Sequence, residues 1–402
     1  MLLASVDMME ALRLTREGKL EEAMAVLRGT SWEKEAPVNR KESKKRPSVT
    51  DMVPPSSQTG AWTMLPVSAE VALRPRGEAV PTLTPVRGKL LDRLRTPKTV
   101  GGREGVAVRT TRPPVLPPGA TFESHEFTNE AGNRNFKLYV PSRYKGEALP
   151  LLVMLHGCTQ SPDDFATGTR MNECAEEHGF FVAYPAQPKS ANPSKCWNWF
   201  NVSEQHRNQG EPSLIAGITL RIMRDYPIET GRVYVAGLSA GGATAAIMGA
   251  TYPDLYAAVG VHSGLPCGAA RDLPSAFAAM RQGSDLASAS APESRTTVPT
   301  IVFHGDGDKT VNPVNGYQVI AQATPAASLK TTVIRGRATG GVEYVRTIQA
   351  DTTGRSILEH WVLRGAGHAW SGGSPAGSYT QPRGPNASGE MVRFFLQHSV
   401  GT

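Results

Sequence analysis

Ser239 lies in a sequence whose residue types and spacing suit a nucleophile. The run from Val233 to Gly237 is apolar and strand-like, a Leu-Ser-Ala-Gly-Gly turn follows it, and an alanine-rich helical stretch comes next. Glycine is needed on both sides of the serine because so sharp a turn leaves no room for side chains. The helix would direct its first amide groups at the reacting oxygen. The pattern predicts that Ser239 attacks an acyl carbonyl.

A serine hydroxyl is a weak nucleophile, so it needs a base, and the base needs an acid to orient it. Both candidates follow later strands in the order serine, acid, histidine. Asp308 follows the apolar run 300–304. His368 stands in a glycine-rich loop after the run 357–363. We expect His368 to be the base and Asp308 the acid.

Other residues compete for these two roles. Asp306 is the rival acid, and we prefer Asp308 because it extends a further turn from the strand end. Asp308 could instead cap a turn, for which aspartate is an ordinary residue. Three further histidines lie in strand-like runs, where we expect them to make framework hydrogen bonds: His262, His304 and His360.

Acyl transfer also needs donors for the oxyanion, and backbone amides at two turns are suited to supply them. We expect the donors to be the N–H groups of Ala240 and of Cys158, which lies in the turn His156-Gly-Cys-Thr-Gln160. The thiol of Cys158 has no paired base, so we expect it to be structural. A bond from Cys158 to Cys196 is one open pairing among the four cysteines, Cys158, Cys174, Cys196 and Cys267.

Tryptophans lie close to these motifs in the sequence. Trp197 and Trp199 belong to a Cys-Trp-Asn-Trp-Phe run, and Trp370 follows His368 by two positions. We predict that all three bind substrate as an apolar wall at the mouth of the site. Core packing is an equally weighted alternative for the pair in the run.

The elements that must position these residues begin after residue 120, where apolar runs of strand length alternate with helical stretches. The expected strands are Phe136–Val140, Leu149–His156, Phe180–Tyr184, Val233–Leu238, Ala257–His262, Thr300–His304 and Ile357–Leu363. Continuous apolar strands separated by helices indicate an α/β fold with a mostly parallel, doubly wound sheet. Chemistry in such sheets sits at the carboxyl ends of the strands. We assign residues 116–402 to this catalytic domain.

Residues 31–115 have the composition of a linker and are predicted to be disordered. They hold 11 of the 31 prolines, and their 16 Lys and Arg against 8 Asp and Glu give a balance of +8. The whole chain carries +7, so the remainder is near −1, and we predict no nucleic-acid partner. The basic run Arg40–Arg46 could meet an anionic surface, but a solvated charge run is the preferred interpretation.

Residues 1–30 are predicted to form a helical arm. Apolar residues recur at helical spacing on both sides of Gly18, which suggests a hairpin. We expect the arm to dock on its own domain or to mediate self-association, with a dedicated partner-binding module as the alternative.

The sequence also bears on location and cofactors. No run reaches the roughly 18 apolar residues that a membrane span needs. Asp7 and Glu10 fall where the apolar part of a signal peptide would lie, so a cytoplasmic location is favoured. The cysteines lack metal-site spacing, and we expect no metal.

Taken together, these motifs resemble the poly(3-hydroxybutyrate) depolymerase family of esterases, specifically its short-chain-length type 1 catalytic domain. The resemblance covers residues 120–400 and rests on the five motifs around Cys158, Cys196, Ser239, Asp308 and His368. It implies an α/β-hydrolase fold, a triad of the last three residues, no metal or organic cofactor, and an ester or polyester substrate. It also leaves an extracellular location open.

The resemblance fixes the reaction better than the substrate, since the family includes feruloyl and acetylxylan esterases. Secreted polymer-degrading members carry a signal peptide and a substrate-binding module after the catalytic domain, whereas this sequence ends at the catalytic domain. We therefore expect hydroxyalkanoate polymer or oligomers, or short acyl esters, with activity on crystalline polymer in doubt. A non-catalytic scaffold attached to a polymer granule or an anionic surface is the alternative from another class.

Overall fold

The computed structural model describes residues 52–53, 63–64, 116–284, 298–325 and 327–401. The predicted arm (1–30) and nearly all of the predicted linker (31–115) lie outside these ranges. The chain divides into two compact units, Met1–Val108 and Arg109–Thr402. In the first unit, β1 (Met52–Val53) pairs antiparallel with β2 (Thr63–Met64).

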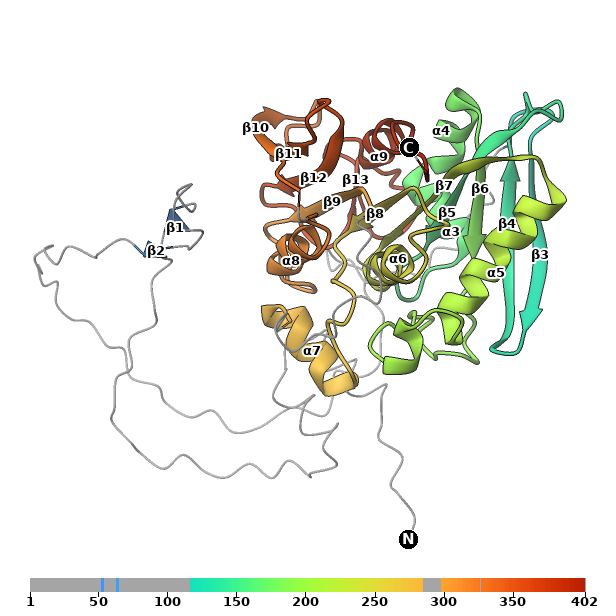
Figure 1. Cartoon of the computed structure of the whole chain (residues 1–402), viewed down its shortest axis with the longest axis horizontal. Coiled ribbons are helices and arrows are strands. Elements are labelled where there is room, and N and C mark those ends of the chain that lie inside the picture. The colour runs from blue at the N-terminus through green and yellow to red at the C-terminus, as the bar shows by residue number, and fades with distance from the viewer. Residues whose placement is uncertain (1–51, 54–62, 65–115, 285–297, 326, 402) are drawn as a thin grey trace, which may run out of the picture. The chain divides into compact units, whose positions relative to one another are not determined.

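The second unit is built on a sheet of ten strands in the order β10-β11-β12-β9-β8-β7-β5-β6-β4-β3 (Figure 1). Their bounds are β3 Thr121–Asn129, β4 Gly132–Val140, β5 Leu149–Leu155, β6 Phe181–Pro185, β7 Ile228–Leu238, β8 Ala258–His262, β9 Thr300–Gly305, β10 Lys330–Arg337, β11 Glu343–Ala350 and β12 Ser356–Leu363. A separate parallel pair joins β13 (Trp370–Ser371) to β14 (Thr380–Gln381).

The centre of the sheet is parallel and its two margins are antiparallel. Strands β12, β9, β8, β7, β5 and β6 pair in parallel, whereas β3 and β4 at one margin and β10 and β11 at the other run antiparallel. The central strands are buried almost without interruption, as both-sided coverage requires. The predicted α/β fold with a mostly parallel sheet is confirmed.

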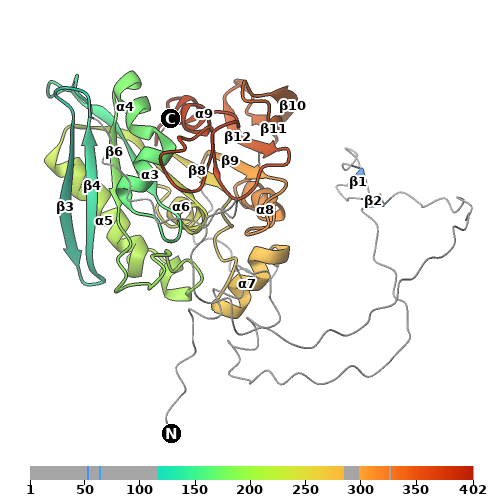
Figure 2. The same ribbon diagram turned by 180° about the vertical axis from the view of Figure 1, so that it is seen from behind.

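Helices cover both faces of the sheet, as Figures 1 and 2 show from opposite sides. The core on one face includes side chains of α5 (Gly210–Asp225), α6 (Ala240–Thr251), α7 (Leu273–Gln282) and α8 (Val314–Gln322). The core on the other face includes side chains of α3 (Pro162–Thr169), α4 (Met171–His178) and α9 (Ala387–Phe395). A short 3₁₀ helix, η1 (Val202–Gln205), precedes α5. The sheet is therefore doubly wound.

This topology brings separate loops to one edge of the sheet. The carboxyl ends of β5, β7, β9 and β12 are Leu155, Leu238, Gly305 and Leu363. Parallel strands share the edge at which they end, so the loops that follow these four strands meet there. Those loops carry the predicted oxyanion turn, nucleophile, acid and base.

Candidate active site

Ser239 stands alone between the end of β7 and the start of α6. Its backbone has φ 58° and ψ −120°, which is unfavourable for a residue with a side chain and costs about 1–3 kcal/mol. A Cβ at Gly237 would collide with the backbone of Gly241, and one at Gly241 with the carbonyl oxygen of Leu155. The Ser239 amide donates to the carbonyl of His262 at 2.9 Å. Neighbouring strands therefore hold the strained turn in place.

Asp308 and His368 are in contact although 60 residues separate them. His368 Nδ1 lies 2.7 Å from Asp308 Oδ2, and the Asp308 side chain is fully buried. The other carboxylate oxygen, Oδ1, accepts the amides of Thr310 and Val311 at 2.8 and 2.9 Å. Burial alone would raise the pKa of Asp308, but hydrogen bonds from His304, His368 and Val311 and the charge of His368 hold it below its usual range. The group is a carboxylate, so His368 carries its proton on Nδ1.

The two predicted oxyanion donors are backbone N–H groups at the same edge. Ala240 is the first residue of α6, so its amide has no partner within the helix. Around Cys158, the Gly157 amide donates to Gln160 Oε1 at 2.9 Å and the Thr159 amide to Ser194 O at 2.7 Å. Among the residues that the structure describes, the Cys158 N–H donates to no acceptor, so it is available to a ligand.

Comparison with known proteins assigns the chain to a family. Residues 134–345 match the model of the family described as Esterase PHB depolymerase. The chain belongs to this family. It is 32% identical over 291 residues to poly(3-hydroxyalkanoate) depolymerase C of Paucimonas lemoignei, covering 70% of this chain and 67% of that protein. It is also 29% identical over 223 residues to acetylxylan esterase A of Emericella nidulans, covering 51% of this chain and 71% of that one.

A solved structure supports the fold. The acetyl xylan esterase from Aspergillus awamori matches with a TM-score of 0.53 and 22% identity, over 69% of this chain and 99% of that one. The α/β-hydrolase fold, membership of the Esterase PHB depolymerase family and the class of carboxylic ester hydrolase are thus established for this chain.

Asp306, the other candidate for the acid of this esterase, bonds to residues other than His368. Asp306 Oδ2 accepts from Arg364 NH1 at 3.0 Å, and its Oδ1 accepts the Gly365 amide at 2.5 Å. These bonds join the loop after β9 to the loop after β12, the loop that carries His368. No hydrogen bond between Asp306 and His368 is found in the described part of the chain. Asp306 therefore braces the two loops.

One rival histidine, His262, makes the framework hydrogen bond expected of it, whereas the buried Nε2 of His360 has no hydrogen-bond partner in the described part of the chain. His262 is fully buried between Phe303 and Trp370, and its Nε2 accepts the amide of Ser371 at 3.0 Å. Burial lowers the pKa of His262 to about 3 and that of His360 to about 3, so both rings are neutral at physiological pH. Neither offers a base to the substrate edge.

His304 has a role that the sequence does not reveal. Its Nε2 lies 2.9 Å from the carbonyl oxygen of Val311 and 3.5 Å from Asp308 Oδ2. The Nε2–H group therefore faces the same carboxylate oxygen that accepts from His368. The spacing of four residues between His304 and Asp308 was the available signal, but it does not show which way a strand-end side chain turns.

The three tryptophans predicted to bind substrate lie in the core of the esterase. Trp197 is 0% exposed, Trp199 6% and Trp370 1%. The indole N–H of Trp197 donates to the His156 carbonyl at 3.1 Å, and that of Trp370 to Ser388 Oγ at 3.0 Å. In this structure none of the three presents a ring face to a substrate. For Trp197 and Trp199, this is the location that the core-packing alternative describes.

Three further observations concern the cysteines, metal ligands and membrane-spanning helices. Cys158 and Cys196 form a disulfide, whereas Cys174 and Cys267 are not in disulfides. Within the described residues, no three His, Cys, Asp or Glu side chains gather as metal ligands would. Within the same ranges, no helix combines the length and apolarity needed to cross a bilayer.

Proposed function

We propose that this esterase works through an acyl-enzyme on Ser239. The observation that carries the proposal is the buried contact between Asp308 and His368 at the edge where Ser239 sits on its strained turn. With Nδ1 protonated and held by Asp308, the ring of His368 has Nε2 free to accept a proton. That is the state a general base for the serine hydroxyl requires.

The reaction follows from these roles. Ser239 Oγ attacks the carbonyl carbon, its proton passes to His368 Nε2, and the amides of Cys158 and Ala240 donate to the oxyanion. The ester C–O bond then breaks and the leaving alkoxide takes the proton from His368 as an alcohol. Water, deprotonated by His368, attacks the acyl carbon. The bond to Oγ then breaks as His368 returns the proton to Ser239, and the acid departs.

For the substrate we propose 3-hydroxyalkanoate polymer or oligomers, or related short acyl esters. The similarity to the poly(3-hydroxyalkanoate) depolymerase supports this class, since it extends over more of this chain than the similarity to the acetylxylan esterase. Acetyl or feruloyl esters of plant cell-wall polymers are the alternative. A hydrolysis panel of hydroxybutyrate oligomers, polymer film, acetylated xylan and feruloyl esters separates the two, with the highest kcat/KM expected on the oligomers.

The triad and a non-catalytic role are separated by active-site labelling. A fluorophosphonate probe should form an adduct on Ser239, and Ser239→Ala should abolish both the adduct and hydrolysis of p-nitrophenyl butyrate. Full activity in Ser239→Ala would disprove the triad. An unlabelled, inactive wild-type chain would favour a scaffold on polymer granules.

The disulfide bears on where the protein works. Disulfides persist in oxidising compartments and are rare in a reducing cytosol. We therefore propose that the Cys158–Cys196 bond forms outside the cytoplasm, in contrast to the cytoplasmic location that the N-terminal sequence favours. Thiol alkylation and mass spectrometry of the protein from separated cell fractions would test this, and a reduced pair in the active fraction would contradict it.

Self-association through the N-terminal arm remains a proposal that rests on the helical spacing of its apolar residues. Light scattering coupled to size-exclusion chromatography should give a larger mass for the full chain than for a chain lacking residues 1–30, beyond the mass removed. Equal oligomeric states would exclude the arm as the contact.

A further inference from the structure

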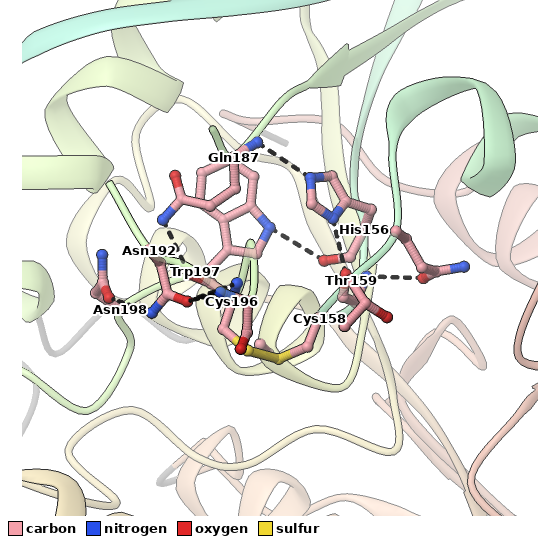
Figure 3. Close-up of a disulfide and its surroundings, with 12 residues drawn as sticks. His156, Cys158, Thr159, Gln187, Asn192, Cys196, Trp197 and Asn198 are labelled. Atoms are coloured by element: carbon pink, nitrogen blue, oxygen red, sulfur yellow. Dashed lines mark hydrogen bonds between the residues drawn. A yellow bond between two sulfur atoms is a disulfide. The ribbon is translucent and has the colours of Figure 1, made fainter. Parts of the chain in front are cut away.

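A loop outside the triad holds the oxyanion turn from one side (Figure 3). We call residues 187–198 the bracing loop and residues 156–160 the oxyanion turn. Four links join them, of which the first is the Cys158–Cys196 disulfide. The backbone amide of Thr159 donates to Ser194 O at 2.7 Å, and the indole N–H of Trp197 donates to His156 O at 3.1 Å. The backbone amide of Gln187 donates to His156 Nε2 at 3.1 Å. Burial lowers the pKa of His156 to about 4, so its ring is neutral and Nε2 can accept. The position of the Cys158 amide thus depends on the bracing loop.

The bracing loop is in turn anchored on one buried carboxylate. Glu211, in the first turn of α5, is 3% exposed. Its Oε2 accepts the Asn198 amide at 2.7 Å, and its Oε1 accepts Asn198 Nδ2 at 2.7 Å and Gln187 Nε2. The same Gln187 nitrogen donates at 2.9 Å to the carbonyl of Cys196, the residue whose side chain forms the disulfide. Both ends of the loop are therefore fixed to Glu211.

Ordinary structural roles do not account for this side chain. An acidic residue in the first turn of a helix commonly caps that helix, but the Glu211 carboxylate binds donors of the loop. The first-turn amide of Glu211 is instead accepted by the carboxylate of Glu204. The only cation bonded to it in the described residues is Arg134, which is 8% exposed and 3.5 Å away. Burying a carboxylate is costly unless several donors meet it, and an amide could not accept from all of them. The arrangement favours rigidity of the loop.

We infer that Glu211 is a positioning residue for the oxyanion donor, acting through the bracing loop on the amide of Cys158. The inference rests on the proposed function, because the amide matters only if an oxyanion forms on Ser239. Glu211 touches neither Ser239 nor His368 in the described structure, so it is not itself a catalytic residue. Its effect should appear in the transition state and not in the binding of the ground-state ester.

The test replaces the carboxylate by its amide, Glu211→Gln, and is read at about pH 8.5, because burial raises the pKa of Glu211 to about 7 and the wild-type group is ionised above that value. The new NH₂ group would face the N–H donors of Asn198 and Gln187, so at least one bond to the loop is lost. We expect kcat on p-nitrophenyl butyrate to fall about tenfold with KM changed less than about twofold. The inhibition constant of a trifluoromethyl ketone, whose adduct with Ser239 carries an oxyanion, should rise by the same factor as kcat/KM falls.

A matched control separates positioning from a general loss of stability. Glu359, on β12, is also a buried carboxylate and is 0% exposed. It pairs with Arg346 of β11 and Arg393 of α9, away from the bracing loop. Glu359→Gln should lower the melting temperature while leaving kcat and the ketone inhibition constant near wild type.

Each outcome decides the inference. A selective loss of kcat and of ketone affinity in Glu211→Gln supports it. Unchanged kcat in Glu211→Gln, or an equal loss of kcat in Glu359→Gln, overturns it while leaving the esterase mechanism intact. A wild-type chain that hydrolyses no ester and takes no fluorophosphonate on Ser239 overturns the proposed function and the inference together.

Discussion

Replacing Asp308 by asparagine should abolish most activity because the surroundings fix which way the amide points. Oδ1 of Asp308 accepts two backbone amides, from Thr310 and Val311, so the asparagine oxygen must take that place. The NH₂ group of the asparagine then faces His368 Nδ1, which in the wild-type chain lies 2.7 Å from Asp308 Oδ2. A ring that accepts at Nδ1 carries its proton on Nε2 and cannot take one from Ser239.

The expected magnitude follows from that change of tautomer. Replacing the acid of a serine triad by its amide lowers kcat by about 10⁴. At about 1.4 kcal/mol per tenfold change, this is roughly 5 kcal/mol of transition-state stabilisation. Steady-state hydrolysis of p-nitrophenyl butyrate measures it directly, and KM should change little because the acid does not touch the ester.

Asp306→Asn is the matched control for Asp308→Asn. Asp306 lies on the same loop but bonds Arg364 and the Gly365 amide, so its replacement should lower kcat less than about threefold. If Asp308→Asn kept more than a tenth of wild-type kcat, or if Asp306→Asn fell as far, the assignment of the acid would be refuted.

Three further predictions concern the surroundings of the site. Cys196→Ser should lower the free energy of unfolding in urea by about 2–4 kcal/mol, since the disulfide joins residues 38 positions apart. The variant should also lower kcat, because the disulfide helps to hold the oxyanion turn. A kcat equal to that of the wild type would show that the turn keeps its position without the disulfide. His304→Phe should lower kcat severalfold while His304→Gln, which keeps a donor near Nε2, should recover most of it; equal activity of the two variants would exclude a hydrogen-bonding role. Stability should fall on acidification below about pH 6.5, because four buried histidines have folded pKa values below their unfolded value and the unfolded chain gains their protons first. These are His156, His262, His360 and His398. Glu211 acts in the opposite sense, since burial raises its pKa to about 7 and its protonation between pH 7 and 4.5 favours the folded state, but it is one group against four. A urea midpoint that rises between pH 7 and pH 5 would contradict this balance.

The sequence missed the margins of the sheet for a physical reason. The predicted strands correspond to the central strands and to β4, where apolar residues are continuous or nearly so. β10 is exposed along almost its whole length, and in β3 exposed residues are interspersed with half-buried ones. Strands held mainly by backbone pairing to a neighbour leave little hydrophobic signal.

The tryptophans show a different limit. Trp197 and Trp199 stand beside Cys196 in the sequence and Trp370 stands two residues after His368, but an aromatic side chain suits a core as well as a substrate wall. Only the tertiary packing shows that all three turn inward: Trp197 and Trp199 enter the core on the face of α5 and α6, and Trp370 enters the core on the opposite face of the sheet.

The sequence by itself determined the features that are local. Glycines 237 and 241 specify the turn at Ser239, and apolar runs specify the strands whose ends carry Asp308 and His368, because sterics and burial act on short segments. Tertiary structure alone decided which side chains meet. The contacts of His304 with Asp308, of Cys158 with Cys196 and of Glu211 with the bracing loop depend on side-chain direction and on distances between segments far apart in the chain, which no sequence spacing encodes.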